Sequence, residues 1–179
     1  MRLARTALLA AAGAACLLAS AAAAGEWRPF SATWTLAGTR TTLPTEGARP
    51  AAVVHVSGSL VTTKGDVIGR GFYGEVIGFD DGGTLLVGRA VFTDERGDKV
   101  FATLRAQPLG TGRTATGTIT GGTGRWAGLE GDFTFSWTFV VEAEGDELHA
   151  LSVNVEGRAR KGTPAPPRTP STASAEPPK

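Results

Sequence analysis

The sequence is almost free of cysteine. Its 179 residues contain a single Cys, Cys16, which lies in a segment that we expect to be removed on export. A mature chain without Cys forms no disulfide and has no thiol to serve as a nucleophile or a metal ligand. We therefore expect an ordinary apolar core to hold the fold together, and about 135 residues are enough to bury one.

Histidine is nearly as scarce. His55 and His149 are the only two, and neither has a Cys or an acidic residue at ligand spacing. The chain also lacks the G-x-S-x-G sequence of a nucleophile elbow. We predict no metal site and no cofactor, and the sequence identifies no catalytic residue.

Runs of basic residues are missing too. Residues 25–160 contain 13 Lys and Arg against 16 Asp and Glu, with no basic block among them. A nucleic-acid-binding surface needs clustered positive charge to replace the counterions of the phosphates. We predict that the protein does not bind nucleic acid.

The longest hydrophobic run is short and rich in alanine. It covers residues 7–18, follows Arg2 and Arg5, and precedes three small residues that end at Ala24. This order is typical of a secretory signal peptide. We predict cleavage near Ala24, a secreted or periplasmic location and no membrane span in the mature chain.

Two alternatives to a cleaved signal peptide are weaker. A retained membrane anchor needs roughly 20 strongly apolar residues, more than this run offers. A lipoprotein modified at Cys16 needs a large aliphatic residue three positions earlier, where Gly13 stands.

The C-terminal residues 161–179 contain Pro, Ser, Thr and Ala and no large apolar side chain. Such a segment cannot offset the entropy of ordering by burial, so we predict a disordered tail. The expected organisation is a signal peptide (1–24), one domain (25–160) and this tail (161–179).

The central domain has the period-two pattern of β-strands. From Asp132 to Glu142, every second residue is apolar, and five of them share one face: Phe133, Phe135, Trp137, Phe139 and Val141. Turn signals separate further segments of this kind, and no helical pattern lies between them. The sequence predicts an all-β, eight-stranded antiparallel up-and-down barrel with strands near 29–39, 51–62, 68–79, 84–93, 99–108, 114–120, 131–143 and 148–160.

Turn residues predict how two of the hairpins pair. A two-residue Asp81-Gly82 loop places Val76 opposite Val87 and Tyr73 opposite Ala90. In this register Glu75 faces Gly88 and Arg89 faces Gly74. Glu75 and Arg89 then lie on opposite faces of the sheet, which a slip by one residue would reverse.

For the last hairpin, a three-residue loop at 144–146 is preferred over a two-residue loop because it pairs apolar residues with one another. It sets Phe139 against Leu151, Trp137 against Val153 and Phe135 against Val155. It also places His149 opposite Val141, at the rim of the barrel.

The third and fourth expected strands differ from the others. Residues 84–92 are apolar on both faces, which an isolated barrel with a wet exterior does not require. Either another segment packs outside the barrel there, or a second subunit does. A homo-oligomer is therefore a candidate assembly.

A glycine-rich stretch at residues 118–128, TITGGTGRWAG, satisfies the dinucleotide-binding pattern G-x-G-x-x-G/A with Gly122, Gly124 and Ala127. That pattern binds pyrophosphate only where it opens a helix, and here an alternating strand follows. We predict no nucleotide. Four glycines, Gly121, Gly122, Gly124 and Gly128, are expected to form the turn between the sixth and seventh strands.

The same stretch carries a family resemblance. GGTGRWAGLEG, followed by an aromatic alternating strand, resembles the glycine signature of the allene oxide cyclase/dirigent barrel superfamily, above all that of its secreted bacterial members of unknown function. HVSGSL, GDVIGRGFYGEVIGF and GRAVFTDERGDKVFATLRA are similar to that group as well. The resemblance covers roughly residues 50–160. It implies an eight-stranded barrel with a partly apolar cavity, often within an oligomer.

The resemblance implies no particular activity. The plant cyclases rearrange a fatty-acid epoxide, and dirigent proteins direct the coupling of phenoxy radicals. The pocket residues of both lie outside the glycine signature, so no catalytic residue is transferred to this chain.

The four Trp have different expected places. Trp34 and Trp137 lie in strands and are candidates for lining a cavity, although packing in the core is their more common role. Trp126 is expected to close one barrel end, and Trp27 to cover an edge.

Tyr73 and Glu75 form the one phenol–acid pair on a single strand face, so they are also candidates for a cavity wall. We favour an outward orientation for both. The acid pairs Asp80/Asp81, Asp94/Glu95 and Asp146/Glu147 lie in turn sequences and are interpreted as solvated turn residues.

Three hypotheses for the function follow. The first is a barrel that binds a small apolar ligand or serves as a scaffold, with Trp34, Phe133, Phe135, Trp137 and Phe139 as candidate lining. The second is a cyclase-like or dirigent-like catalyst that uses Tyr73 and Glu75. The third is an oligomeric envelope or interaction protein.

Overall fold

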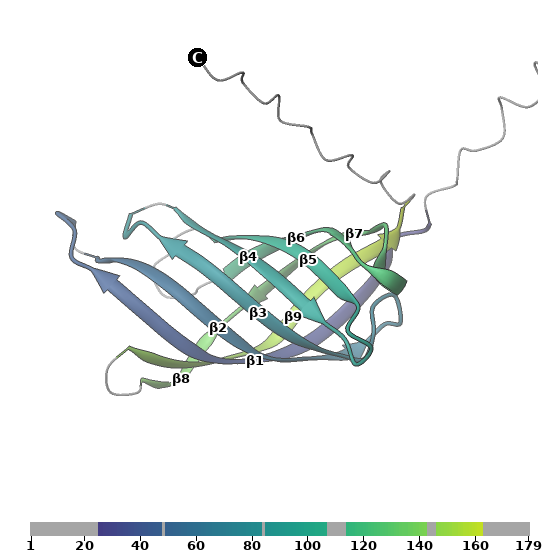
Figure 1. Ribbon diagram of the computed structural model, residues 1–179, viewed down its shortest axis with the longest axis horizontal. Coiled ribbons are helices and arrows are strands. Elements are labelled where there is room, and N and C mark those ends of the chain that lie inside the picture. The colour runs from purple at the N-terminus through teal and green to yellow at the C-terminus, as the bar shows by residue number, and fades with distance from the viewer. Residues whose placement is uncertain (1–24, 48, 84, 107–113, 143–145, 163–179) are drawn as a thin grey trace, which may run out of the picture.

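The computed structural model describes residues 25–47, 49–83, 85–106, 114–142 and 146–162. These residues form one antiparallel barrel with a single short 3-10 turn, η1 (Gly124–Trp126) (Figure 1). The strands are β1 (Arg28–Leu43), β2 (Ala51–Lys64), β3 (Gly71–Asp80), β4 (Leu86–Thr93), β5 (Lys99–Ala106), β6 (Thr114–Gly122), β7 (Leu129–Ser136), β8 (Thr138–Glu142) and β9 (Glu147–Lys161).

Consecutive strands pair from β1 to β7, and β9 pairs with β1 to close the barrel. Both β7 and β8 pair with β9, so together they make one strand position of the barrel, interrupted at Trp137. The predicted closed, eight-stranded antiparallel barrel is therefore confirmed. The predicted continuous strand 131–143 is instead two shorter strands.

A bulge in β9 accompanies this interruption. The partner of Ala32 is Val155, whereas the partner of Trp34 is Ser152, so β9 contains one extra residue between them. The side-chain oxygen of Asn154 accepts a hydrogen bond from the backbone N–H of Ser136 at 3.2 Å, at the end of β7. The bulge turns Val153 to the outside, where 70% of it is exposed.

The period-two pattern separates inside from outside. In β3, Phe72 and Val76 are buried in the barrel, while Tyr73 and Ile77, each the next residue along the strand, are exposed. Inward glycines leave space for rings: a Cβ on Gly74 would lie 3.0 Å from Cδ1 of Phe92 and 3.1 Å from Cζ2 of Trp34.

The predicted β3–β4 register is wrong. The connection spans residues 81–85 rather than two residues, and Val76 pairs with Ala90 instead of Val87. The carboxylate of Asp81 builds the longer loop by accepting hydrogen bonds from the N–H groups of Gly83 and Leu85 at 2.7 and 3.0 Å. The register moves by an odd number of residues, so Glu75 and Arg89 lie on the same outer face.

The β8–β9 hairpin is predicted correctly near its tip. Val141 pairs with His149 as expected, but a register shift follows and Phe139 pairs with Ala150 rather than Leu151. Trp137 lies between β7 and β8 and belongs to neither ladder. The bulge in β9 exposes Val153, so Trp137 and Val153 do not pair. The pairs that the sequence predicts for Phe139 and Trp137 are therefore wrong.

The pairing of β7 with the other half of β9 keeps the predicted alignment. Phe133 pairs with Gly157 and Thr134 with Glu156, the register in which Phe135 would meet Val155.

The two ends of the domain meet at one end of the barrel. The N–H of Gly25 donates to the carbonyl oxygen of Lys161 at 2.8 Å, and that of Gly162 donates to Gly128 at 2.7 Å. β9 thus continues to Lys161, the first residue of the predicted tail. The expected signal peptide and residues 163–179 of that tail lie outside the described residues.

Candidate ligand cavity

One half of the barrel is hollow. A cavity of about 500 Å³ opens at the end where β1 finishes and β2 begins, which we call the open end. Its wall is made mainly by inward apolar residues of seven strands: Trp34, Leu36, Ala52, Val54, Val56, Val76, Leu104, Ala106, Ala115, Phe135, Leu148 and Ala150.

Trp34 lies at the inner end of this cavity, in the middle of the barrel. Its ring is fully buried and packs at tilted angles against Phe92 at 5.2 Å and Phe135 at 5.5 Å between ring centroids. Its indole N–H has no hydrogen-bond partner among the described residues. The three rings divide the hollow half from the packed half.

The mouth of the cavity is polar. Arg49, from the β1–β2 connection, donates to a carboxylate oxygen of Asp80 at 2.9 Å, and the N–H of Gly82 donates to the other oxygen at the same distance. Arg40 and Arg105 also line the cavity. The described lining residues thus include three Arg and one Asp, and the charge of the acid is balanced by Arg49.

The other half of the barrel is packed. Phe30, Leu60, Ile68, Phe72 and Val100 are all buried there, and the void between these side chains measures only about 30 Å³. Rings of Phe92 and Phe133 meet edge to face at 6.3 Å. The chain therefore fills one half of its barrel with side chains and forms a cavity in the other.

Trp126 closes the packed end, as predicted from the sequence. Its ring is buried and tilts against Phe72 at 5.5 Å, while its N–H donates to Asp94 at 2.6 Å. The guanidinium of Arg125 lies 5.0 Å from the centre of the same ring. η1 places both side chains where the β4–β5 turn can reach them.

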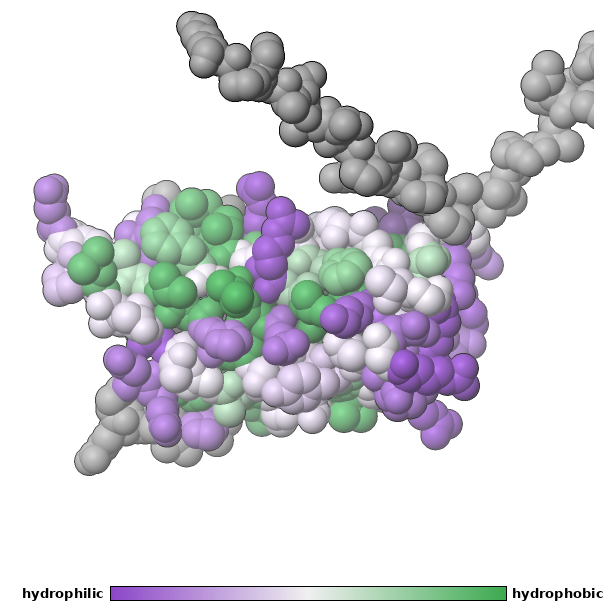
Figure 2. Space-filling model, viewed as in Figure 1, coloured by the Kyte–Doolittle hydropathy of each residue, from purple (hydrophilic) through white to green (hydrophobic). Residues whose placement is uncertain are grey.

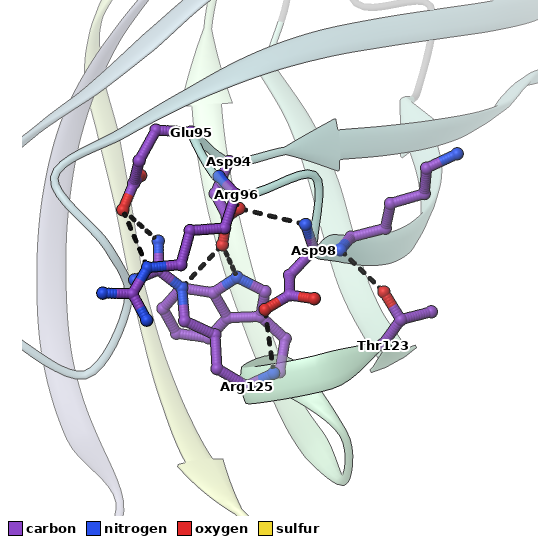
Figure 3. A network of polar contacts seen from close by, with 8 residues as sticks. Asp94, Glu95, Arg96, Asp98, Thr123 and Arg125 are labelled. Atoms are coloured by element: carbon purple, nitrogen blue, oxygen red, sulfur yellow. Dashed lines mark hydrogen bonds and ion pairs between the residues drawn. The ribbon is translucent and has the colours of Figure 1, made fainter.

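Asp94 organises this end (Figure 3). One carboxylate oxygen accepts from Trp126 and from Nε of Arg125, each at 2.6 Å, and the other accepts from the N–H groups of Arg96 and Asp98 at 2.8 and 3.0 Å. Burial by itself would raise the pKa of Asp94. The hydrogen bonds, above all the one from Trp126, outweigh this effect, so the pKa of Asp94 lies below its ordinary value.

The interpretation of the acid pairs as solvated turn residues is wrong for Asp80 and Asp94. Both make the expected turn bonds to nearby N–H groups, but only 8% of Asp80 and 6% of Asp94 are exposed. Each is buried because an Arg from a distant loop reaches it, Arg49 and Arg125 respectively. Local sequence alone carries no signal for those partners.

The candidate lining residues fall into three groups. Trp34, Phe135 and Trp137 line the cavity, whereas Phe133 lies in the packed half beside Phe92. The backbone of Phe139 belongs to β8, and its side chain lies outside the described part of the chain.

Tyr73 and Glu75 do not line the cavity, and their inclusion among the cavity residues is wrong. Both are exposed on the outer face of β3, the orientation that the sequence favours, and the Tyr73 hydroxyl donates to Ser57 Oγ at 2.7 Å. Alternation requires this, because their neighbours Phe72 and Val76 face inward.

The glycine stretch forms the predicted turn between β6 and β7. Gly121, Gly124 and Gly128 have φ angles of 141°, 50° and 73°, which favour glycine. Gly122 has no room for a side chain, because a Cβ there would lie 2.5 Å from the carbonyl oxygen of Lys99. These glycines shape the chain around Trp126.

Trp27 lies on the outside of the barrel, where the guanidinium groups of Arg158 and Arg160 lie 4.9 and 4.5 Å from its ring centre. It covers β9 rather than a free edge.

Among the described residues, no three His, Cys, Asp or Glu side chains are grouped to hold a metal ion. The described part of the chain also contains no helix with the length and apolar character to cross a membrane.

Comparison with known proteins found no family model that matches the chain, and neither a curated protein nor a solved structure that matches it.

Proposed function

We propose that the protein binds one small apolar molecule in the hollow half of its barrel. The observation that carries this proposal is the cavity of about 500 Å³ with its apolar wall and open mouth. Small-molecule sites commonly measure roughly 300–1,000 Å³ and combine an apolar wall with a few polar groups. An eight-stranded barrel can enclose either packed side chains or one small ligand.

The contrast between the two halves supports binding over a purely structural role. The packed half holds a void of only about 30 Å³. Protein interiors are otherwise close-packed, and each atom that lines a void loses dispersion contacts. A ligand beside Trp34 and Phe135 would restore contacts that the chain itself does not make.

The polar mouth suggests how such a ligand lies. Its apolar body would occupy the inner cavity, and any polar or anionic end would lie near Arg40, Arg49 and Arg105. The carboxylate of Asp80 is already paired with Arg49, so it does not compete with a ligand for Arg40 or Arg105.

Export and family are part of the same proposal. Arg2, Arg5 and the apolar run before Ala24 support a secreted or periplasmic carrier. The glycine signature supports a relation to the allene oxide cyclase/dirigent barrels. The alternative, a cyclase-like or dirigent-like catalyst, has no candidate residue in the cavity, because Tyr73 and Glu75 face away from it.

A titration with an apolar fluorescent probe, N-phenyl-1-naphthylamine, tests the proposal. Gly78 faces the cavity, and a Cβ there would meet only the Val87 carbonyl oxygen, at 3.5 Å. Gly78→Leu should therefore fill the cavity without strain and abolish probe binding. Gly71→Leu is the matched control, since Gly71 points outward in the same strand and has no atom within 4 Å of the Cβ position.

We expect saturable binding of one probe per chain in the natural protein and in Gly71→Leu. Equal binding by Gly78→Leu would place the probe elsewhere and overturn the proposal. No binding by any of the three proteins would leave a scaffold role as the better description.

A further inference from the structure

The cavity has two features that the chain itself leaves incomplete, and the indole of Trp34 is the first. Its Nε1 atom is buried and has no hydrogen-bond partner among the described residues, whereas the other buried indole, that of Trp126, donates to Asp94. Buried N–H groups are almost always hydrogen-bonded, because an unpaired one has lost its water without replacement. Trp34 borders the cavity, so a molecule inside the cavity can supply the missing acceptor.

The second feature is a pair of glycines in the cavity wall, which we call the glycine shelf. Gly78 in β3 and Gly88 in β4 are partners in the ladder, both line the cavity, and neither has a positive φ angle. A Cβ on Gly88 would lie 3.1 Å from the carbonyl oxygen of Ile77, but a Cβ on Gly78 would meet only that of Val87, at an ordinary 3.5 Å. Glycine weakens the middle of a strand and often marks a place where a ligand approaches the backbone closely.

Other inward glycines of the barrel have their space filled by the chain. Gly74 lies under two of the buried rings, and Gly117 lies under the ring of Phe133. Gly58 instead meets the backbone of Thr35 in the neighbouring strand. The space over the glycine shelf belongs to the cavity, so the shelf has room for a ring that the chain does not provide.

Side chains surround the glycine shelf within the cavity wall. Two of them belong to the neighbouring strands β2 and β5, two lie toward the inner end of the cavity and two toward its mouth. In that order they are Val54 and Leu104, Val76 and Ala90, and Asp80 and Leu86. A flat ring contacts the bare backbone over its whole face, and dispersion contacts add up atom by atom. A flexible chain touches the same surface along a line and loses rotamer freedom when it is held there.

We propose that the cavity selects a flat ring compound that carries a carbonyl oxygen. The inference rests on the proposed function and narrows the class of its ligand. The ring lies on the glycine shelf, and the carbonyl oxygen accepts a hydrogen bond from Nε1 of Trp34.

The position of the Trp34 indole connects the two features. Its Cζ2 atom, which is bonded to the same ring carbon as Nε1, lies 3.1 Å from the Cβ position of Gly74. Gly74 and Gly78 belong to the same inward face of β3, so the N–H edge of the indole lies on the side of the barrel that carries the shelf. Val76 and Phe135, which line the inner cavity, have no polar side-chain atom. A carbonyl oxygen therefore fits better than a hydroxyl, whose own hydrogen needs an acceptor.

The outside of β3 is the place where an apolar compound can adhere without entering the barrel. Ile77 and Phe79 are 62% and 43% exposed there, and Figure 2 shows hydrophobic residues gathered over this side of the barrel. Gly78 stands between these two residues in the sequence but lines the cavity. A methyl group at Gly78 therefore changes the cavity wall and leaves the outer face as it is, which separates the two places in a binding experiment.

A pair of isosteric compounds tests the hydrogen bond. The ketone 2-acetylnaphthalene has a carbonyl group where 2-isopropenylnaphthalene has an alkene group of the same shape, and equilibrium dialysis measures the affinity of each. Trp34→Phe should lower the ratio of ketone affinity to alkene affinity roughly three- to tenfold, the effect of one net hydrogen bond. In NMR spectra of the natural protein, one indole N–H resonance should move downfield with the ketone and not with the alkene, a reading that does not depend on the variant.

A flexible ketone tests the ring site. The compound is 2-dodecanone, which has the same number of carbon atoms as 2-acetylnaphthalene. Gly78→Ala should weaken binding of the naphthyl ketone roughly tenfold, because the methyl group lifts the ring off the shelf, and should change binding of 2-dodecanone less than about twofold. Gly71→Ala is the matched control on the outer face of β3, and Ile77→Ser removes apolar surface there. Both should bind the three compounds like the natural protein.

The outcomes separate this inference from the proposed function, once circular dichroism has shown that each variant is folded. An unchanged affinity ratio in Trp34→Phe would overturn the inference, as would equal losses of both ketones in Gly78→Ala. In these cases the cavity binds apolar molecules without selecting a ring, and the proposed function stands. Losses in Ile77→Ser instead of Gly78→Ala, or no binding of any compound, would contradict the proposed function as well.

Discussion

Asp94 shows how much one residue contributes at the packed end of the barrel. Its carboxylate accepts four hydrogen bonds, two from side chains and two from its own turn, although its side chain has no exposed surface. A buried charge is tolerated only when it is paired and hydrogen-bonded, as this one is. Asp94 therefore fixes Trp126 and the turn together.

Asp94→Asn should destabilise the barrel by about 2–4 kcal/mol, because the amide presents one oxygen where two accept. One pair of donors, either the two side chains or the two N–H groups of the turn, then faces an NH2 group. Urea unfolding measures the change. Glu95→Gln serves as a control: Glu95 also bonds to Arg125 but is exposed, and it should change little. Equal losses in both variants would contradict this account.

The lowered pKa of Asp94 has a consequence for acid stability. Its stabilising contribution is complete above 3.8, the ordinary pKa of the carboxyl, and is lost as the pH falls from there through the lower pKa of the folded state. In thermal melts between pH 6 and pH 2, the natural protein should lose more stability than Asp94→Asn. Parallel pH profiles would show that other groups dominate.

The two buried indoles allow a matched comparison. The N–H of Trp126 is bonded to Asp94, whereas that of Trp34 has no partner among the described residues. Replacement by Phe removes a similar volume from each. Trp126→Phe should therefore cost about 1–3 kcal/mol more than Trp34→Phe in chemical denaturation. The reverse order would show that Trp34 is bonded in solution.

At this scale the sequence predicts orientation better than burial. Strict alternation in β3 places Tyr73 outward, and the turn glycines predict that Trp126 caps an end. Asp94 is missed because an acid in a turn has the same local sequence whether its side chain is solvated or reached by a distant Arg. Burial here depends on a loop 31 residues away along the chain.

At the scale of elements, turn length decides which residues meet. The predicted two-residue β3–β4 loop and the observed connection share the sequence Asp81-Gly82. The difference is that the Asp81 side chain bonds two N–H groups ahead and stabilises a longer loop. The bulge in β9 likewise depends on Asn154 bonding across to β7, which alternation along one strand cannot reveal.

Close approach of β1 and β2 should make one strand glycine irreplaceable. A Cβ on Gly58 would overlap the carbonyl oxygen of Thr35 in the neighbouring strand, so a side chain there must displace β1. Gly58→Ala should destabilise the protein by about 2 kcal/mol or more, whereas Gly71→Ala should be nearly neutral. Thermal unfolding compares them, and similar melting temperatures would contradict the close approach.

At the scale of the whole molecule, the barrel has two unlike halves. The eight strand positions of the barrel and their antiparallel order follow from periodicity and turn signals, and the sequence predicts them. The cavity does not follow, because its volume is the difference between the space that eight strands enclose and the sum of many side chains. Phe133 and Phe135 illustrate this, since they share one strand face yet lie in the packed and hollow halves.

The charge at the mouth should select among ligands of equal length. Arg40→Gln should weaken binding of decanoate roughly three- to tenfold, because one charged partner of the carboxylate is lost. Binding of decanol should change little. Displacement of the fluorescent probe measures both affinities, and equal effects on the acid and the alcohol would place the polar end elsewhere.

The central claim is that an apolar molecule occupies the space between Trp34 and the mouth. A crystal structure of the protein soaked with 1-bromodecane tests this most directly, because anomalous scattering locates the bromine. The account predicts a bromine inside the cavity lined by Val56, Val76 and Phe135. Bromine found only over Ile77 and Phe79 on the outer face of β3, or no ordered bromine at all, would contradict it.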